Sequence, residues 1–171
     1  RDWSSDVCSS DLHKKMNITR IDKNKLNKEQ LATLFKKYYN ELEILNTPIK
    51  LIDNGELLWI EQVEKSIGKN VVLITAEKNN EIHGFAHGQL KLGPDYFGNP
   101  LIGHIAHIYV SKETRQAGIG REIYEKLHSW FLEKKVSSIE LQVVSENEGA
   151  LKFWNKMGFK KEILQLRHVL A

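Results

Sequence analysis

The sequence predicts one α+β domain, built on a mixed, mostly antiparallel central sheet that about four helices flank. Three observations lead to this class. The chain has 171 residues, the usual size of a single domain. Three strand-like segments follow one another between residues 71 and 110 with turn signals between them, which is typical of an antiparallel meander. Helical and strand patterns then alternate, so at least one connection should be a crossover between parallel strands.

Composition and charge narrow the range of partners. The formal net charge is +3, with basic and acidic residues interspersed along the chain. This balance is too weak and too mixed to predict a nucleic-acid-binding surface, although it would admit an anionic small ligand. No apolar run approaches the roughly 18 residues that a membrane span needs. We therefore expect neither nucleic acid nor a membrane as a partner.

The first residues, RDWSSDVCSSDL, differ from the rest of the chain. They have no helical or strand period and lack the apolar segment of a signal peptide. They look like the translation of a sequencing adapter, so we expect residues 1–15 to be a non-native, disordered leader and residues 16–171 to form the domain. A natural disordered tail is the alternative. No export signal follows Met16, which favours the cytoplasm.

The leader also contains the only cysteine of the chain, Cys8. The domain proper then has no thiol, which excludes disulfides, cysteine–metal sites and cysteine nucleophiles from it. The histidines show no metal-like spacing such as His-Glu-x-x-His, so no metal site is expected.

The domain is expected to begin with a strand over residues 16–21. Asn27, followed by Gln30, resembles a helix-capping pair. Behind it apolar residues recur at steps of three and four, which predicts an amphipathic helix; they are Leu31, Leu34, Phe35, Tyr38, Leu42 and Leu45. Pro48 interrupts this pattern, and a second helix is predicted over residues 56–66. Its expected inward residues are Leu57, Ile60 and Val63.

The middle of the chain is expected to form the meander. Residues 71–76 are β-branched and apolar, which favours a strand. Residues 78–81 have the composition of a hairpin turn, and residues 82–92 return as the second strand. The loop 93–100 contains two glycines and two prolines and leads into a third strand over residues 102–110.

The last third should supply the crossover. Residues 119–135 place apolar side chains on one face of a helix, and residues 139–144 are rich in Ile, Leu and Val, as in a strand. A short helix over residues 147–157 ends at Gly158. We expect residues 159–170 to finish the sheet as one further strand.

A loop with two glycines, RQAGIG from Arg115 to Gly120, lies between the third meander strand and the helix that follows. The N-terminus of a helix exposes unpaired N–H groups and a positive dipole end, which attract phosphate. Gly118 and Gly120 would let the backbone come close to a ligand. Arg115 adds one positive charge to the loop, and Arg121 could add a second. The loop lacks Gly-Lys-Ser/Thr and an intact Gly-x-Gly-x-x-Gly, so it matches neither a Walker loop nor a dinucleotide fingerprint. Taken alone, such a turn is most often only a turn.

The order of strand, Arg-x-x-Gly-x-Gly, helix, strand, Asn-x-x-Ala and Gly-Phe resembles the GNAT superfamily of acetyl-CoA-dependent N-acetyltransferases. The resemblance is best over residues 102–159. The residues that carry it are Val110, Arg115, Gly118, Gly120, Asn147, Ala150, Phe153, Gly158 and Phe159.

The resemblance implies a site for acetyl-CoA. The pyrophosphate of the cofactor would lie on the amides of residues 116–120, and the pantetheine arm would pair with residues 108–110, where that strand splays from the next. The side chain of Asn147 would point at the pantetheine amides. The implied cofactor-binding residues are Ile108, Tyr109, Val110, Arg115, Gln116, Ala117, Gly118, Ile119, Gly120, Arg121, Asn147 and Phe153.

In such enzymes a base on the strand before the loop often takes the proton of the amine. His104 matches that position, and an imidazole with a pKa near ~6.5 suits a base at neutral pH. Without a bulge, His104 would share one face of the strand with Ile108 and Val110, and His107 would face the other way. A structural or exposed histidine is the alternative reading of His104, and a structural role is favoured for His107.

The resemblance also implies a proton donor for the leaving thiolate. The family usually has a tyrosine at the position where this chain has Trp154. An indole N–H does not titrate, so Trp154 can orient the sulfur but cannot supply a proton, and packing is the favoured reading of this residue. Water or the Ser145 hydroxyl could replace the tyrosine. The oxyanion would be held by a backbone N–H near Ile108.

Acceptor pockets of the family are lined by the first two helices and a meander loop. The matching aromatic residues here are Tyr38, Tyr39, Trp59, Tyr96 and Phe97. The sequence therefore predicts an N-acetyltransferase that transfers the acetyl group of acetyl-CoA to a primary amine of a small molecule or protein, by direct attack in a ternary complex. The alternative is an acyl-CoA-binding or sensing module with little catalysis. The oligomeric state stays open, a homodimer included.

Overall fold

The computed structural model describes residues 15–47 and 50–169. Its centre is a five-stranded sheet in the order β1-β2-β3-β4-β5. The strands are β1 (Asn17–Arg20), β2 (Val71–Lys78), β3 (Glu81–Leu92), β4 (Leu101–Val110) and β5 (Ser138–Leu141). The first four pair antiparallel and β5 joins β4 in parallel. The expected α+β class, with a mixed and mostly antiparallel sheet, is confirmed.

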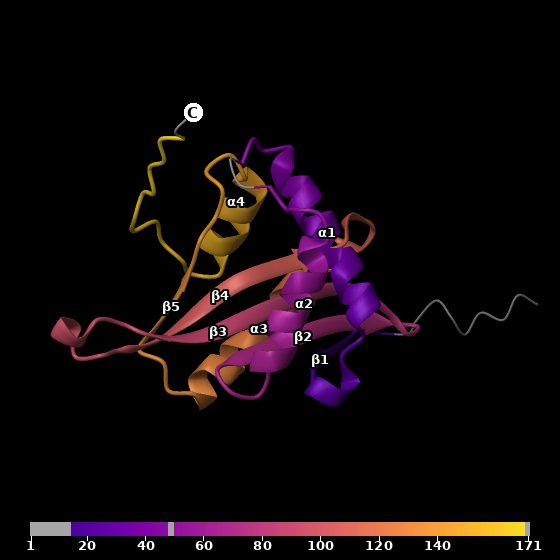
Figure 1. The fold of residues 1–171 in the computed structure, drawn as a ribbon, viewed down its shortest axis with the longest axis horizontal. Coiled ribbons are helices and arrows are strands. Elements are labelled where there is room, and N and C mark those ends of the chain that lie inside the picture. The colour runs from indigo at the N-terminus through magenta and orange to yellow at the C-terminus, as the bar shows by residue number, and fades with distance from the viewer. Residues whose placement is uncertain (1–14, 48–49, 170–171) are drawn as a thin grey trace, which may run out of the picture.

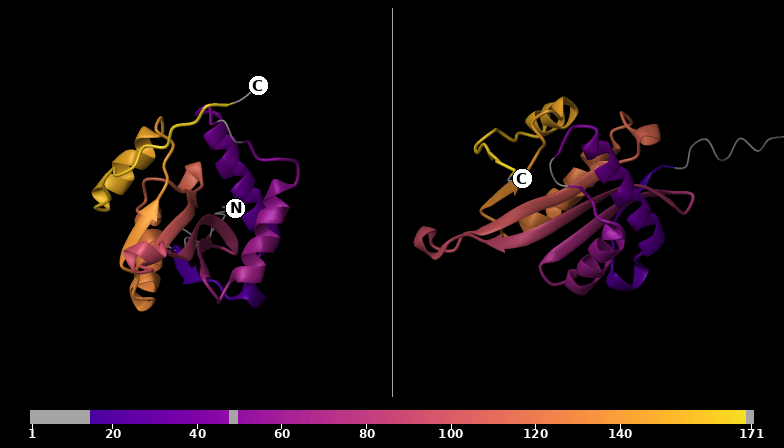
Figure 2. Two further views of the ribbon diagram at one scale, coloured as in Figure 1. Left: turned by 60° about the vertical axis from the view of Figure 1, so that its left-hand side comes forward. Right: turned by 45° about the horizontal axis from the view of Figure 1, so that its top comes forward.

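Helices cover both faces of the sheet. They are α1 (Lys28–Glu43), α2 (Gly55–Ser66), α3 (Ile119–Glu133) and α4 (Glu148–Lys156). The pair α1 and α2 lies on one face, while α3 and α4 lie on the other (Figures 1 and 2). The apolar core is accordingly divided in two, one cluster under α1 and α2 and one under α3 and α4. We call these the α1–α2 cluster and the α3–α4 cluster.

Local signals explain several of these elements. The Asn27 side chain accepts a hydrogen bond from the Gln30 amide at 3.2 Å, which caps α1 as predicted. The hairpin between β2 and β3 turns at Asn79 and Asn80, with φ angles of 54° and 63°. Two consecutive residues with positive φ are the geometry of a tight hairpin turn, which asparagine tolerates better than most residues.

Two expectations about the fold are wrong. Residues 160–169 have no regular secondary structure, so the final strand over 159–170 is absent from the part of it that is described. Ile163, Leu164 and Leu166 are all largely exposed, so the apolar side chains of the tail are not buried against the sheet. Leu57 is also exposed, because it lies on the outer side of α2. Residues 1–14, which hold most of the expected leader, and Pro48 lie outside the described residues.

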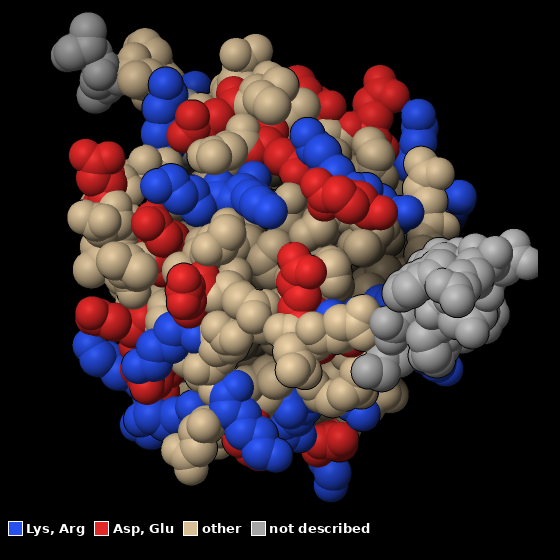
Figure 3. Space-filling model, turned by 90° about the vertical axis from the view of Figure 1, so that its right-hand side faces the viewer, with Lys and Arg blue, Asp and Glu red and all other residues tan. Residues whose placement is uncertain are grey.

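The surface charge is mixed. On the face shown in Figure 3, Lys and Arg side chains alternate with Asp and Glu side chains. No helix of the described residues is long and apolar enough to cross a membrane.

Candidate active site

The first feature of the site is an open strand edge. The parallel pairing of β4 with β5 ends at Ile105 and Leu141. Beyond it β4 continues for residues 106–110, and the edge that it turns toward β5 pairs with no strand of the described chain. Backbone N–H and C=O groups need partners unless they face water. An extended ligand with amide groups could therefore add to this edge as a further strand.

The second feature is the loop that opens α3. The helix begins at Ile119 with Gly118 as its N-cap, and Gln116 and Gly118 have φ angles of 69° and 83°. The backbone N–H groups of residues 116–120 donate to no acceptor in the described parts of the chain. Five unpaired donors at the positive end of a helix form a favourable place for an anion such as phosphate.

The helix α4 meets this loop at the end of β4. A Cβ atom built on Gly120 would lie 3.6 Å from the Phe153 ring and 3.8 Å from Val110. At the start of α4 the Asn147 Oδ1 atom accepts a hydrogen bond from the Ala150 amide at 3.0 Å. The capping bond uses the oxygen of the Asn147 amide and leaves its nitrogen as a donor.

Both arginines of the predicted phosphate site have protein partners. Arg115 Nη2 lies 2.7 Å from Glu41 Oε2 of α1, and Arg115 Nε donates to the Val110 carbonyl at 2.8 Å. The Tyr109 hydroxyl donates to the other oxygen of Glu41 at 2.8 Å. Burial and the bond to Glu41 raise the pKa of Tyr109 above its ordinary value. Glu41 therefore joins α1 to the loop and to β4.

Arg121 lies further along and pairs with Glu125 on the outside of α3, with Nε and Oε1 2.8 Å apart. Exposed pairs of this kind are weak, so the guanidinium can exchange its partner for a ligand at little cost.

A bulge in β4 decides which way its side chains point. Pairing with β3 joins His87 to His107 and Gly88 to Ile105, which leaves Ala106 as an extra residue. An extra residue shifts the alternation of side chains by one, so the two halves of β4 follow opposite parities.

His104 comes before the bulge and faces α1 and α2. A Cβ atom on Gly103 would lie 2.6 Å from the Phe131 ring of α3, and Ile105 packs in the α3–α4 cluster. His104, between these two residues, must therefore point to the opposite face of the sheet.

The grouping of His104 with Ile108 and Val110 was expected only for a strand without a bulge, and the bulge separates them. Tyr109 packs in the α1–α2 cluster, whereas Ile108 and Val110 pack against the α3–α4 cluster. His107 has the parity of Tyr109 and therefore shares a face with His104. The sequence alone gives no sign of the extra residue at Ala106.

The histidines facing α1 and α2 form a network that the sequence did not reveal. The His87 and His107 rings stack at 5.3 Å, and their Nδ1 atoms lie 3.1 Å apart. Trp59 Nε1 lies 3.4 Å from His87 Nδ1, and the Tyr39 hydroxyl lies 3.5 Å from His107 Nε2. The Gln89 side-chain amide lies 3.2 Å from His87 Nε2. Sequence reasoning missed this network because it depends on pairing across β3 and β4.

Burial determines the charge of this pair. Desolvation, followed by the influence of neighbouring histidines, lowers the pKa of His87 to about 4 and that of His107 to about 3. Both rings are therefore neutral near neutral pH.

His104 has a carboxylate partner on β5. Its Nδ1 atom lies 3.1 Å from Glu140 Oε1, across the parallel pair that joins the two residues. Burial and Lys91 lower the pKa of His104, and Glu140 opposes them. The carboxylate can only accept, so Nδ1 carries a proton and the lone pair of the neutral ring lies on Nε2.

The predicted acid position holds a buried side chain. Trp154 is 5% exposed and packs edge-to-face against Tyr124 and Phe159, with ring centroids 5.5 and 5.0 Å apart. Ser145 donates its hydroxyl to Glu146 at 2.7 Å on the surface.

Of the five predicted acceptor-side aromatic residues, three come together around Phe35 and His107, and the other two lie elsewhere. Tyr38 and Tyr39 lie in edge contact beside His107, and Trp59 is buried against Phe35. Tyr96 and Phe97 instead sit at the exposed tip of the β3–β4 hairpin, which projects beyond the body of the molecule (Figure 1).

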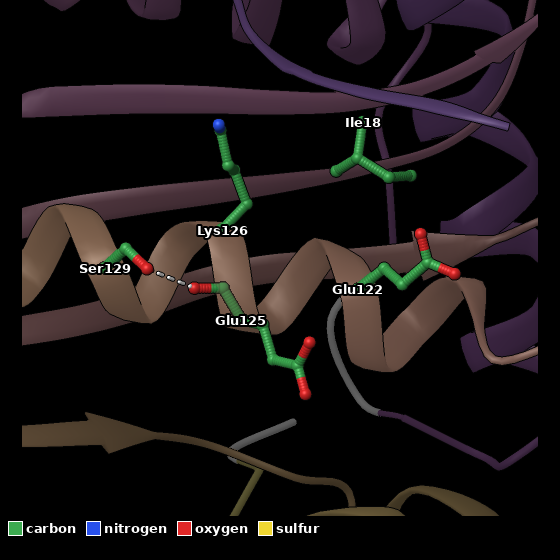
Figure 4. A pocket seen from close by; sticks show the side chains of 5 residues that line it. All are labelled: Ile18, Glu122, Glu125, Lys126 and Ser129. Atoms are coloured by element: carbon green, nitrogen blue, oxygen red, sulfur yellow. Dashed lines mark hydrogen bonds between the residues drawn. The ribbon is translucent and has the colours of Figure 1, made fainter.

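Two shallow hollows lie elsewhere on the surface. One, of about 300 Å³, lies at the surface where β1 packs beside α3 (Figure 4). Its lining residues are Ile18, Glu122, Glu125, Lys126 and Ser129. The other, of about 400 Å³, lies along α1 and α2. Neither includes a residue of the 115–120 loop or a histidine. Among the described residues, no three His, Cys, Asp or Glu side chains are grouped so that they could hold a metal ion.

The sheet, the glycine loop at the start of α3 and the strand that parts from its neighbour define an acetyltransferase-type fold. The chain belongs to the acetyltransferase (GNAT) family, whose family model matches residues 30–159. No curated protein matches the sequence.

Solved structures agree on the fold. A point mutant of the BH1408 protein from Bacillus halodurans is 20% identical, with 91% of this chain and 100% of that chain covered and a TM-score of 0.78. The aminoglycoside acetyltransferase meta-AAC0020, from an uncultured soil metagenomic sample, is 19% identical over 91% and 97% of the chains, with a TM-score of 0.68. The aminoglycoside N-acetyltransferase AAC(6')-Iy, solved with CoA, is 16% identical over 90% and 95%, with a TM-score of 0.71.

Proposed function

We propose that the protein is an acetyl-CoA-dependent N-acetyltransferase that acts on a primary amine of a small molecule or a protein. The observation that supports this most is the open edge of β4 at residues 106–110, beside the five unpaired amides of residues 116–120. A strand edge and an anion site in this order suit a ligand that joins amide groups to a pyrophosphate. The family membership and a neighbour solved with CoA support the same ligand.

The cofactor-binding roles follow from this arrangement. The amides of residues 116–120 would hold the pyrophosphate, with Arg115 and Arg121 adding positive charge. The backbone of residues 108–110 would pair with the pantetheine arm, and the free amide nitrogen of Asn147 would donate to it. Phe153 would form the apolar wall of the cleft against Gly120.

The reaction would be direct attack in a ternary complex. The neutral amine adds to the thioester carbon, a backbone N–H near Ile108 holds the oxyanion, and the C–S bond then breaks to release the thiolate. His104 would accept the amine proton at Nε2, because Glu140 holds the proton of Nδ1. Trp154 supplies no proton, and water would protonate the thiolate, since a thiol pKa near ~8.5 makes it a fair leaving group.

A thiol-release assay with a panel of amines, together with a melting scan in acetyl-CoA, tests the proposal. We expect stabilisation by acetyl-CoA and turnover with at least one amine. The absence of a hydroxyl at Trp154 favours the second candidate, an acyl-CoA-binding or sensing module. Stabilisation without turnover on any amine would support that module, and no stabilisation of a folded sample would contradict both.

His104 has its own test. His104→Gln should remove the ionisation of the base from the pH dependence of kcat/KM and lower the rate by roughly 10²–10⁴. The shift in melting temperature caused by acetyl-CoA should stay as in the wild type, because the cofactor contacts are elsewhere. An unchanged pH–rate profile would remove His104 from the mechanism.

A further inference from the structure

In the hydrogen-bond network on the α1–α2 face of the sheet, chemistry determines which group donates and which accepts in each contact. An indole N–H can only donate a hydrogen bond. Trp59 Nε1 lies 3.4 Å from His87 Nδ1, so this nitrogen must accept. A neutral imidazole carries one proton, and the proton of His87 therefore lies on Nε2.

The direction then passes from one histidine to the next. His87 Nδ1 has no proton, and His107 Nδ1 lies 3.1 Å from it. The hydrogen bond can form only if His107 Nδ1 carries a proton and donates it, so the single lone pair of His87 Nδ1 is shared between His107 at 3.1 Å and Trp59 at 3.4 Å. His107 Nε2 is then a lone pair, and the Tyr39 hydroxyl, 3.5 Å away, must donate to it.

The side-chain amide of Gln89 must be oriented to agree with this assignment of the protons. The Gln89 amide nitrogen lies 3.2 Å from His87 Nε2, where a protonated ring nitrogen requires an acceptor. An amide can present its oxygen instead by a half-turn, whereas an indole cannot become an acceptor. The Trp59 contact therefore decides the direction, and Gln89 adapts by turning its oxygen to His87.

We propose that this chain of hydrogen bonds, Tyr39 to His107 to His87, makes the Tyr39 oxygen a fixed acceptor that recognises an N–H group of the amine substrate. Tyr39 thereby becomes a residue that determines acceptor specificity, while Trp59, His87 and His107 position it. The inference rests on the proposed function, which it extends from the cofactor to the second substrate.

The location of Tyr39 supports this role. His107 is the second residue of β4 beyond its last pairing with β5, and residue 108 begins the segment proposed to bind the cofactor. The Tyr39 hydroxyl, which contacts the His107 side chain, therefore lies on the α1–α2 face beside the strand segment proposed to bind the cofactor. Burial raises the pKa of Tyr39, so its hydroxyl keeps the proton that it donates to His107. Its oxygen lone pairs are then left for a ligand donor.

Histidine NMR tests the direction without any substrate. In protein labelled with ¹⁵N-histidine at neutral pH, long-range ring correlations should show His107 protonated at Nδ1 and His87 at Nε2. Trp59→Phe keeps an aromatic ring on Phe35 but removes the donor, and the two rings should then populate both tautomers. His107 protonated at Nε2 in the wild type would overturn the proposal.

Steady-state kinetics test the recognition. Tyr39→Phe should raise the KM for the amine about fivefold to tenfold, the effect of losing one hydrogen bond, and leave the melting shift with acetyl-CoA unchanged. Tyr124→Phe, which removes a hydroxyl on the α3 face, is the matched control and should keep the wild-type KM. An unchanged KM in Tyr39→Phe would refute the role of Tyr39 while the acetyltransferase proposal stands. Wild-type protein without turnover on any amine would refute both, and the NMR would still decide the tautomers.

Discussion

His107→Gln should flatten the dependence of stability on pH. In the folded protein burial lowers the pKa of His107 to about 3, against an ordinary value of 6.5. The unfolded chain therefore binds a proton between these values that the folded protein does not bind. The stability from keeping the ring neutral is fully present above pH 6.5, and it is lost as the pH falls toward 3.

The magnitude follows from the linkage relation. At pH 5 the ring of His107 is almost fully protonated in the unfolded chain but not in the folded protein. This difference lowers the free energy of unfolding by about 2 kcal/mol relative to neutral pH, and near pH 5 the free energy of unfolding changes by about 1.3 kcal/mol per pH unit. This is a large part of a typical folding free energy of about 5–15 kcal/mol. The variant should lose this slope, whatever its stability at pH 7.5.

Urea unfolding at pH 5 and pH 7.5 measures the effect. The free energy of unfolding should differ between the two pH values by about 2 kcal/mol less in His107→Gln than in the wild type. His168→Gln removes an exposed histidine of the tail and serves as the control. Equal pH dependence in the wild type and His107→Gln would refute the burial of a neutral ring.

Two further predictions concern glycines. Gly118→Ala should reduce the melting shift with acetyl-CoA more than Gly120→Ala does, because Gly118 has a φ of 83° while a Cβ on Gly120 meets Phe153 only at ordinary contact distance; equal shifts in the two variants would contradict this. Gly103→Ala should lower the unfolding free energy in urea by about 1–3 kcal/mol, because its Cβ would lie 2.6 Å from the Phe131 ring; wild-type stability would show that the ring can move.

Elements with strong local signals could be predicted from the sequence. The apolar period of α1, its Asn27 cap and the turn at Asn79 and Asn80 involve residues within a few positions of one another. The glycine loop before α3 is local as well, since its geometry needs only a strand, a positive φ at Gly118 and a helix start. Such features follow from the local backbone conformation, which residues within a few positions of one another determine.

Contacts between distant segments could not be predicted. Glu41 pairs with Arg115, which is 74 positions later, and nothing near either residue indicates the other. The tail over residues 160–169 failed for the opposite reason. Its composition favours a strand, but strand formation also depends on burying one face against the sheet, and Ile163, Leu164 and Leu166 of the tail are largely exposed.

The bulge at Ala106 explains why the open edge of β4, proposed to bind the cofactor, and the histidine network occur on the same strand. A bulge bends its strand and increases the local twist, and the pairing of β4 with β5 ends at Ile105, the residue just before it. The same extra residue turns His107 toward α1 and α2, and leaves Ile108 on the α3–α4 side. One insertion therefore accompanies the open strand edge and places the histidine network on the opposite face of the sheet from Ile108, an arrangement that fits the proposed separation of the amine from the cofactor.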